Sequence, residues 1–191
     1  MTAKEEIREQ LLSHRNEIDP NTIQEKSRQI AFHLYQQDEF LEADKVHIFT
    51  SFGSEPDTNA IREYALHLKK IVYVPVIERE RREFHNVQVD PNMQYEPGLF
   101  GIPNPVFKKH PMKFIEKPEL HLTENDVVII PMLAFDGKLH RLGYGHGYYD
   151  RFLNRNPAFK IGIAFDVQRI EEIPVEEFDI PLDMIITEST V

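Results

Sequence analysis

The sequence predicts an α/β protein, a three-layer α/β/α sandwich with a mostly parallel sheet. Short apolar segments of strand length alternate with amphipathic segments of helix length along the 191 residues, which is typical of parallel strands joined by helices. The segment 126–133, DVVIIPML, is apolar at successive positions, as expected of a central strand covered on both faces. A chain of this length supports one sizeable core, so we expect residues 1–191 to form a single domain.

Local signals mark the first two helices. Thr2 and Glu5 have the spacing of a capping box, so a helix is expected from there to about Arg15. Asp19 is placed to cap a second helix, in which Pro20 takes the first helical position. Apolar residues at helical spacing then give this second helix one buried face.

The remaining elements follow in alternation. The expected strands are 45–52, 71–77, 83–89, 126–133, 160–165 and 182–187, and the expected helices are 55–70 and 148–156. The strand at 83–89 is more polar than the others, which favours a position at the edge of the sheet. Residues 93–125 are rich in proline, and no helix is predicted there. A long irregular segment in a compact domain is usually functional or disordered.

Composition excludes several classes of protein. The chain has no cysteine, which rules out disulfides, thiolate zinc sites and a thiol nucleophile and is consistent with a reducing compartment. The N-terminal residues lack the apolar core of a secretory signal, and no apolar run reaches membrane-spanning length. The net charge of −10 argues against broad affinity for nucleic acid or anionic membrane. We therefore expect a cytoplasmic monomer whose partners are small molecules.

A glycine-rich segment, RLGYGHGYYDRF at 141–152, is the strongest functional signal. Gly143, Gly145 and Gly147 occupy alternate positions, although the whole chain has only 8 glycines. The segment lies between a predicted strand and a predicted helix, where backbone N–H groups and a helix N-terminus can bind an anion. Its spacing differs from that of the dinucleotide fingerprint and of the P-loop. The segment predicts a phosphate-binding loop; the alternative is a tight turn packed on aromatic side chains.

Motifs along most of the chain carry a resemblance to a known family. The segment PMLAFDGKLHRLGYGHGYYDRFL, residues 131–153, resembles the signature of the 5-formyltetrahydrofolate cyclo-ligase (5,10-methenyltetrahydrofolate synthetase) family. KEEIR at 4–8, SEPDT at 54–58, FGIPNP at 100–105 and PLDMIIT at 181–187 are similar to the family's other landmarks, in the same order. The resemblance implies an α/β/α sandwich and a ligase that forms a C–N bond. It also implies an ATP- and Mg-dependent cyclisation of 5-formyltetrahydrofolate to 5,10-methenyltetrahydrofolate, with ADP and phosphate released, through an iminium phosphate.

The resemblance also implies the site residues. ATP contacts are expected from Lys4, Glu5, Glu6, Ile7 and Arg8, and from Arg141, Leu142, Gly143, Tyr144, Gly145, His146, Gly147, Tyr148 and Tyr149. Substrate contacts are expected from Thr50, Glu55, Tyr144, Gly145, His146, Gly147 and Tyr148, and catalytic roles from Glu55, Arg141 and Tyr149. Magnesium is expected at Asp150 and Asp183.

Each of these assignments has a structural alternative. Lys4 and Arg8, four residues apart, could form one solvated helix face. Glu55 could simply begin the next helix, since acids favour that end. Asp150 could pair with a basic side chain, and Asp183 could be an ordinary acid at a strand end. Two other functions stay open: a nucleotide-binding regulatory domain without turnover, and a sugar-phosphate isomerase or acyl-transfer enzyme on a similar sheet.

Overall fold

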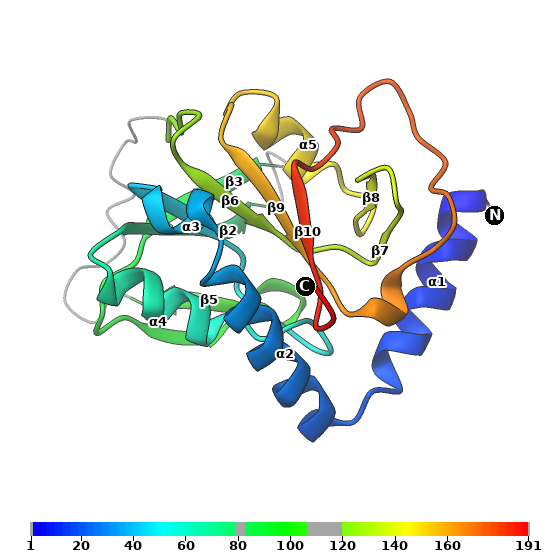
Figure 1. The fold of residues 1–191 in the computed structure, drawn as a ribbon, viewed down its shortest axis with the longest axis horizontal. Coiled ribbons are helices and arrows are strands. Elements are labelled where there is room, and N and C mark those ends of the chain that lie inside the picture. The colour runs from blue at the N-terminus through cyan, green and yellow to red at the C-terminus, as the bar shows by residue number, and fades with distance from the viewer. Residues whose placement is uncertain (1, 79–82, 107–119, 191) are drawn as a thin grey trace.

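The computed structural model describes residues 2–78, 83–106 and 120–190, and its centre is a six-stranded sheet (Figure 1). The strand order is β10-β9-β6-β1-β2-β3. These strands are β10 (Met184–Ile186), β9 (Phe159–Ile163), β6 (Val127–Ile130), β1 (Lys45–Ile48), β2 (Ile71–Glu78) and β3 (Glu83–Gln88). All neighbours pair in parallel except β2 and β3, which pair antiparallel. The predicted mostly parallel sheet and the edge position of the 83–89 strand are therefore confirmed.

Helices cover both faces of this sheet. They are α1 (Ala3–Asn16), α2 (Pro20–Leu34), α3 (Asp38–Glu42), α4 (Asn59–His67) and α5 (Tyr148–Leu153), with short 3₁₀ turns η1 (Leu99–Gly101) and η2 (Asp166–Gln168). Residues from α2, α3 and α4 pack on one face of the sheet, and Leu153 of α5 packs on the other. The predicted three-layer arrangement is thereby confirmed.

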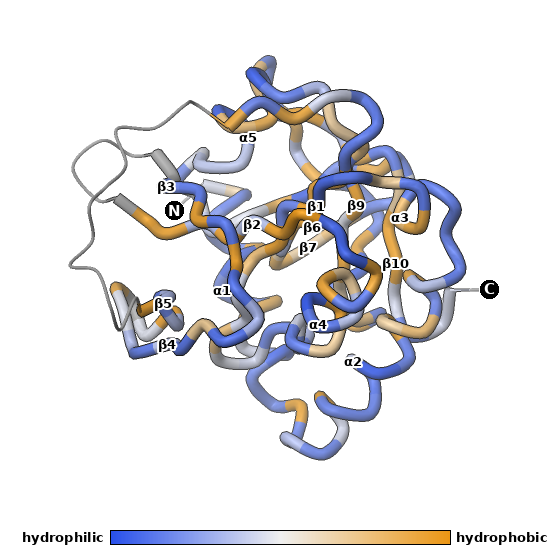
Figure 2. The backbone as a smooth tube through the Cα atoms, turned by 90° about the vertical axis from the view of Figure 1, so that its left-hand side faces the viewer, coloured by the Kyte–Doolittle hydropathy of each residue, from blue (hydrophilic) through white to orange (hydrophobic). Residues whose placement is uncertain are grey.

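The central strands alternate between the two faces, and both directions are buried. In β6, Val127 and Ile129 point into the cluster under α2 to α4, whereas Val128 and Ile130 point into the cluster beneath α5. All four side chains are at most 1% exposed. Figure 2 shows hydrophobic residues concentrated in the central strands and hydrophilic residues over much of the surrounding chain. In the part of the chain that the structure describes, no helix is long and apolar enough to span a membrane.

The two N-terminal helices begin where the capping signals predicted. The Thr2 side chain accepts a hydrogen bond from the Glu5 N–H, and the Glu5 carboxylate accepts one from the Thr2 N–H at 2.7 Å. The Asp19 carboxylate caps α2 by accepting from Asn21 N–H and Thr22 N–H. Both caps act within one turn, which explains why the sequence alone located them.

Other boundaries differ from the prediction. The helix predicted at 55–70 begins only at Asn59, because residues 51–58 form a turn in which Thr58 N–H donates to the Ser51 hydroxyl at 2.9 Å. The predicted strands 45–52 and 126–133 end at Ile48 and Ile130. Each then continues as irregular chain at the carboxyl edge of the sheet.

Two antiparallel ribbons and the helix α3 were not predicted. One ribbon, β4 (Gln94–Pro97) with β5 (Pro103–Val106), lies in the segment predicted to be irregular; residues 107–119 lie outside the described part. Prolines are tolerated there because a two-stranded ribbon has only edge strands. The other ribbon, β7 (Ala134–Phe135) with β8 (Arg141–Leu142), leads into the glycine-rich segment.

Candidate active site

A cavity of about 480 Å³ lies at the carboxyl ends of the parallel strands. Phe49 and Thr50, which follow β1, and Pro131, which follows β6, form its floor. The helix α1 and the glycine-rich segment supply the facing wall. Open α/β sheets place their ligands at this edge, so the cavity lies where the sheet topology predicts a site.

Most of the predicted site residues line this cavity. They are Lys4, Arg8, Thr50, Glu55, Arg141, Leu142, Gly143, Tyr144, Gly145, His146, Gly147, Tyr148, Tyr149 and Asp150. Three predicted ATP contacts on α1 do not line it. Glu5 and Glu6 are exposed, and Ile7 packs beside Leu11. Helical geometry explains the split, because residues four apart share a face whereas their immediate neighbours do not.

Asp183 is also absent from the cavity lining. Its Oδ2 accepts from the backbone N–H of Lys160 at 2.8 Å and lies 2.6 Å from the Lys160 ammonium. It directly precedes β10, so it belongs to the amino ends of the strands. The structure therefore does not bring Asp183 together with Asp150 in the cavity, and the strand-end alternative describes its contacts.

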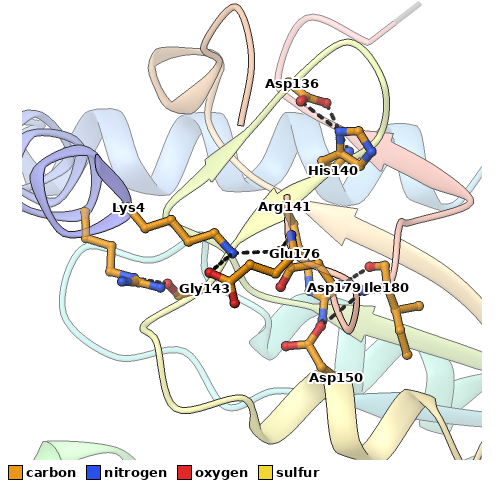
Figure 3. A network of polar contacts seen from close by, with 10 residues as sticks. Lys4, Asp136, His140, Arg141, Gly143, Asp150, Glu176, Asp179 and Ile180 are labelled. Carbon is orange, nitrogen blue, oxygen red and sulfur yellow. Dashed lines mark hydrogen bonds and ion pairs between the residues drawn. The ribbon is translucent and has the colours of Figure 1, made fainter. Parts of the chain in front are cut away.

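The polar end of the cavity pairs cations with carboxylates (Figure 3). Arg141 Nη2 donates to Asp150 Oδ1 at 2.5 Å, and Arg141 also donates to the Ile180 carbonyl. Lys4 Nζ lies 2.7 Å from Asp179 and 3.1 Å from Glu176. Partial burial opposes the charge of Lys4, but hydrogen bonds to these two carboxylates outweigh it and raise the Lys4 pKa.

The acids Glu176 and Asp179 were missed by the sequence analysis. They line the cavity beside Lys4 although they lie more than 170 residues from it in the chain. The only local signal is a cluster of acids, EEFD at 176–179, between two prolines. Such a cluster is usually a solvated surface, so the tertiary fold alone reveals its place.

The opposite end of the cavity contains a buried carboxylate. Glu55 is 3% exposed; its Oε1 accepts from the Tyr144 hydroxyl at 2.7 Å, and its Oε2 accepts from Phe52 N–H at 3.1 Å. Burial raises the pKa of Glu55 to about 7, against the opposing charge of Arg15 and these two hydrogen bonds. Phe49, Phe52, Pro75, Ile77 and Ile102 give this end apolar walls.

The Thr50 hydroxyl faces the same region. It is buried and has no hydrogen-bond partner among the residues that the structure describes. A buried hydroxyl without a partner is unfavourable. A polar ligand atom would satisfy it.

The glycine-rich loop uses glycine for backbone conformation and for close contact. Gly145 and Gly147 adopt φ of +88° and +65°, a region that side chains with a Cβ rarely enter. A Cβ on Gly145 would stand 3.0 Å from Cζ of Arg8, whose Nε donates to the Gly143 carbonyl at 2.9 Å. Gly147 begins α5. The loop therefore uses glycine to adopt this backbone conformation, and it lines the cavity.

The fold and the cavity define a class of protein. The chain is an α/β protein with a cavity at the carboxyl edge of a parallel sheet, cationic and glycine-lined at one end and apolar around a buried carboxylate at the other. Such a cavity fits a small molecule that carries anionic and apolar parts.

Comparison with known proteins gives the family. The model of the 5-formyltetrahydrofolate cyclo-ligase family matches residues 1–188, so the chain belongs to this family of ligases. It is 34% identical over 180 residues to the 5-formyltetrahydrofolate cyclo-ligase of Escherichia coli (strain K12), covering 93% of this chain and 96% of that protein. The corresponding enzyme of Haemophilus influenzae is 28% identical over 183 residues, 94% of each chain.

Solved structures agree in fold. The NMR structure of Aquifex aeolicus 5,10-methenyltetrahydrofolate synthetase superposes with a TM-score of 0.79 at 28% identity, covering 99% of this chain and 91% of that one. A 5,10-methenyltetrahydrofolate synthetase from Mycoplasma pneumoniae has the same fold, with a TM-score of 0.73 at 19% identity over 98% of this chain and 100% of that one. The family resemblance, the fold class and the ligase class predicted from the sequence are confirmed.

Proposed function

We propose that this protein cyclises 5-formyltetrahydrofolate to 5,10-methenyltetrahydrofolate with ATP and magnesium, releasing ADP and phosphate. One observation carries the proposal. In a chain of this family, a single cavity joins a cationic, glycine-lined end to an apolar end with a buried carboxylate. The cationic end suits a nucleoside triphosphate and the apolar end suits a folate. The two molecules must meet for phosphoryl transfer.

The proposed reaction uses ATP to make the formyl oxygen a leaving group. The formyl oxygen attacks the γ-phosphorus, the bond to the bridging oxygen breaks, and ADP departs. The neighbouring folate amine then attacks the activated carbon and gives up its proton, and the C–O bond breaks to release phosphate. Phosphoryl transfer of this kind depends on positioning and charge neutralisation more than on covalent catalysis, which agrees with the absence of a nucleophilic triad among the lining residues.

At the polar end, Lys4, Arg8 and Arg141 would bind the phosphates. Charge-assisted hydrogen bonds of this kind are among the strongest that side chains make. The backbone of residues 143–147 lines the same space. In the free protein Lys4 and Arg141 are already paired with carboxylates, so phosphate binding would share or replace these pairs.

Those carboxylates support a magnesium site. Asp150 and Asp179 line the cavity where phosphates would lie, and a cation between these carboxylates and the phosphates would offset their mutual repulsion. No group of three or more potential metal-ligating side chains occurs in the described residues, but magnesium usually takes one or two carboxylates plus phosphates and waters. We therefore propose Asp150 with Asp179, in place of Asp183. Magnesium would supply charge neutralisation of the phosphates.

At the apolar end, Thr50 and Glu55 would contact the folate, with residues 144–148 closing over it. A carboxylate whose pKa is about 7 is suited to accept the proton that the attacking amine loses. Burial raises the pKa of Tyr149, so its phenol stays neutral beside Arg141 and would serve as a hydrogen-bond donor. The perturbed acid favours an enzyme over a regulatory domain.

The test is a coupled assay. Purified protein with ATP, Mg and 5-formyltetrahydrofolate should form the methenyl product, followed by its near-UV absorbance, with ADP and phosphate in equal amounts. ATP turnover should need the folate. Folded protein that makes no product under these conditions would refute the proposal and favour the regulatory alternative.

A further inference from the structure

We propose that Arg15 is a positioning residue for the folate end of the cavity: from α1 it holds the Tyr144 hydroxyl and the turn before Glu55, and thereby holds the Glu55 carboxylate in place. The role of Glu55 in turnover rests on the proposed function; the contacts of Arg15 do not. Arg15 itself does not line the cavity.

The first argument is the contact set of Arg15. It is 2% exposed, although arginine is almost never fully buried unless paired. Its Nε donates to Ser54 Oγ at 3.0 Å, its Nη1 to the Met132 carbonyl at 3.3 Å, and its Nη2 to the Tyr144 hydroxyl at 2.7 Å. Ser54 directly precedes Glu55, and Tyr144 donates to Glu55 at 2.7 Å. One guanidinium thus holds Glu55 through two routes.

The second argument is charge. A buried cation needs a compensating anion, yet no carboxylate lies within ion-pair distance of Arg15 in the described part of the chain. The nearest partner in its hydrogen-bonded chain is Glu55, one hydroxyl away through Tyr144. Arg15 and Glu55 are therefore a cation and a carboxyl group linked through the Tyr144 hydroxyl. The charge of each partly offsets the unfavourable free energy of burying the other.

The third argument is the place of Arg15 on α1. Lys4, Arg8, Leu11 and Arg15 follow at intervals of four, three and four, so they share one helix face. This face presents Lys4 and Arg8 to the polar end of the cavity, and it presents Arg15 to the Tyr144 hydroxyl, which lies against Glu55 at the other end. Tyr144 itself belongs to the glycine-rich loop, which Arg8 also holds through Gly143. One helix therefore sets the loop and the carboxylate relative to each other.

The fourth argument is the surroundings of Glu55. The groups that face it are Arg15 from α1, Tyr144 from the loop, Tyr149 from α5 and the Phe52 N–H. Among these, Arg15 is the only cation. Burial pushes the pKa of Glu55 upward and Arg15 opposes this. Loss of the cation would raise that pKa by about one to three further units, the usual effect of a nearby opposite charge.

The experiment compares Arg15→Met, which removes the charge, with Arg15→Lys, which keeps it but lacks the fork that reaches three partners. In Arg15→Met, the acid limb of the kcat/KM profile for 5-formyltetrahydrofolate should move at least one unit to higher pH. In Arg15→Lys the limb should stay near that of the wild type while the folate KM rises. Arg28→Met, which alters an exposed arginine on α2, is the matched control.

A readout independent of turnover separates this inference from the proposed function. The Glu55 carboxyl, ¹³C-labelled and assigned with Glu55→Gln, can be titrated by NMR in wild type and in Arg15→Met. If Arg15→Met does not fold, Tyr144→Phe breaks the same relay with a smaller change and should also raise the Glu55 titration midpoint. An unchanged midpoint in whichever variants fold overturns the inference, even if the wild type is fully active.

A double-mutant cycle distinguishes positioning from general support of the fold. If Arg15 acts through Glu55, Arg15→Met should add little further loss of kcat/KM in the Glu55→Gln background. Fully additive losses in the two backgrounds would show that Arg15 acts elsewhere and would overturn the positioning role.

Discussion

Gly145 combines two constraints that act on different properties of the protein. Its φ of +88° is unfavourable for alanine, and an added Cβ would stand 3.0 Å from Cζ of Arg8. We predict that Gly145→Ala loses on the order of 1 kcal/mol of folding stability from the backbone. Displacement of Arg8 should also raise the ATP concentration required for binding several-fold.

The comparison for Gly145 is Gly143, whose Cβ would meet nothing within 4 Å and whose φ is not positive. Gly143→Ala should therefore unfold close to the wild-type temperature. Calorimetric ATP titration and thermal unfolding of both variants measure the two effects. Wild-type ATP affinity in Gly145→Ala would mean that the Arg8 contact has no part in nucleotide binding.

The proposed magnesium site includes Asp179 but not Asp183, which is only four residues away. Asp179 lines the cavity, whereas Asp183 pairs with Lys160 outside it. Asp179→Asn should raise the Mg concentration required for half-maximal activity by roughly tenfold or more, the usual loss of metal affinity when a residue that supports a metal site is changed. Asp183→Asn should leave that concentration unchanged. Titration of activity with Mg at saturating ATP decides, and the reverse pattern would restore Asp183 as the ligand.

Glu55 should make folding stability depend on pH. Its pKa rises from 4.5 to about 7 on folding because of burial, so the folded state binds the proton more tightly than the unfolded state. The stabilisation is complete below about pH 4.5 and is lost as pH rises through about 7. Between pH 5 and 8, wild type should therefore lose stability relative to Glu55→Gln, which cannot titrate. Urea unfolding of both proteins across this range measures it, and a constant difference would contradict the raised pKa.

At the scale of elements, the sequence predicted what local chemistry controls. The positions of two helix starts and of one strand could be predicted, because each depends only on residues close in the sequence. These are the caps at Thr2 and Asp19 and the apolar residues of β6. The strands β7 and β8 have only two residues each, too short for a periodic signal. The strands β4 and β5 contain Pro97, Pro103 and Pro105, and proline argues against a strand in sequence-based prediction. The acids beside Lys4 could not be predicted as site residues, because Glu176 and Asp179 come close to that lysine only in the folded chain.

The helix α1 carries two of the cations that line the cavity, Lys4 and Arg8, so its packing should affect the geometry of the site. Leu11, 4% exposed, packs with Ala134, Leu142 and Ile173 and fixes the middle of the helix. Leu11→Ala should cost about 2–5 kcal/mol, the usual range for a buried leucine. The ATP and folate KM should both rise, since Lys4, Arg8 and Arg15 move with the helix. Leu12→Ala, which changes a partly exposed neighbour, is the control, and both variants are measured by urea unfolding and by kinetics. Unchanged KM values in folded Leu11→Ala would show that the packing of α1 does not affect the site.

At the scale of the whole molecule, the protein brings a few cations together locally, against a net charge of −10. Lys4, Arg8 and Arg141 converge from α1 and the glycine-rich segment on one cavity. The sheet topology places that cavity, and the sequence predicted its edge because strand, glycine-rich loop and helix follow in order. The placement of α1 across it could not be predicted, because it depends on packing between segments distant in the chain.

Because the cavity lies between α1 and the sheet edge, a bound nucleotide should hold these parts together and stabilise the fold. A ligand at 100 times its Kd contributes about 2.7 kcal/mol. For a domain of this size each kcal/mol shifts the Tm by about 2–4 °C. We therefore predict that saturating MgATP raises the Tm by roughly 5–11 °C.

The phosphates should supply most of this stabilisation if the three cations bind them. AMP lacks the β- and γ-phosphates and should shift the Tm much less at the same concentration. Lys4→Gln should reduce the shift with MgATP, whereas Arg28→Met, on the exposed face of α2, should not. Thermal unfolding of the three proteins with each nucleotide is the measurement. Equal shifts with ATP and AMP would mean that the nucleotide is held by its base and sugar, and that the cations at this end of the cavity bind another anionic group.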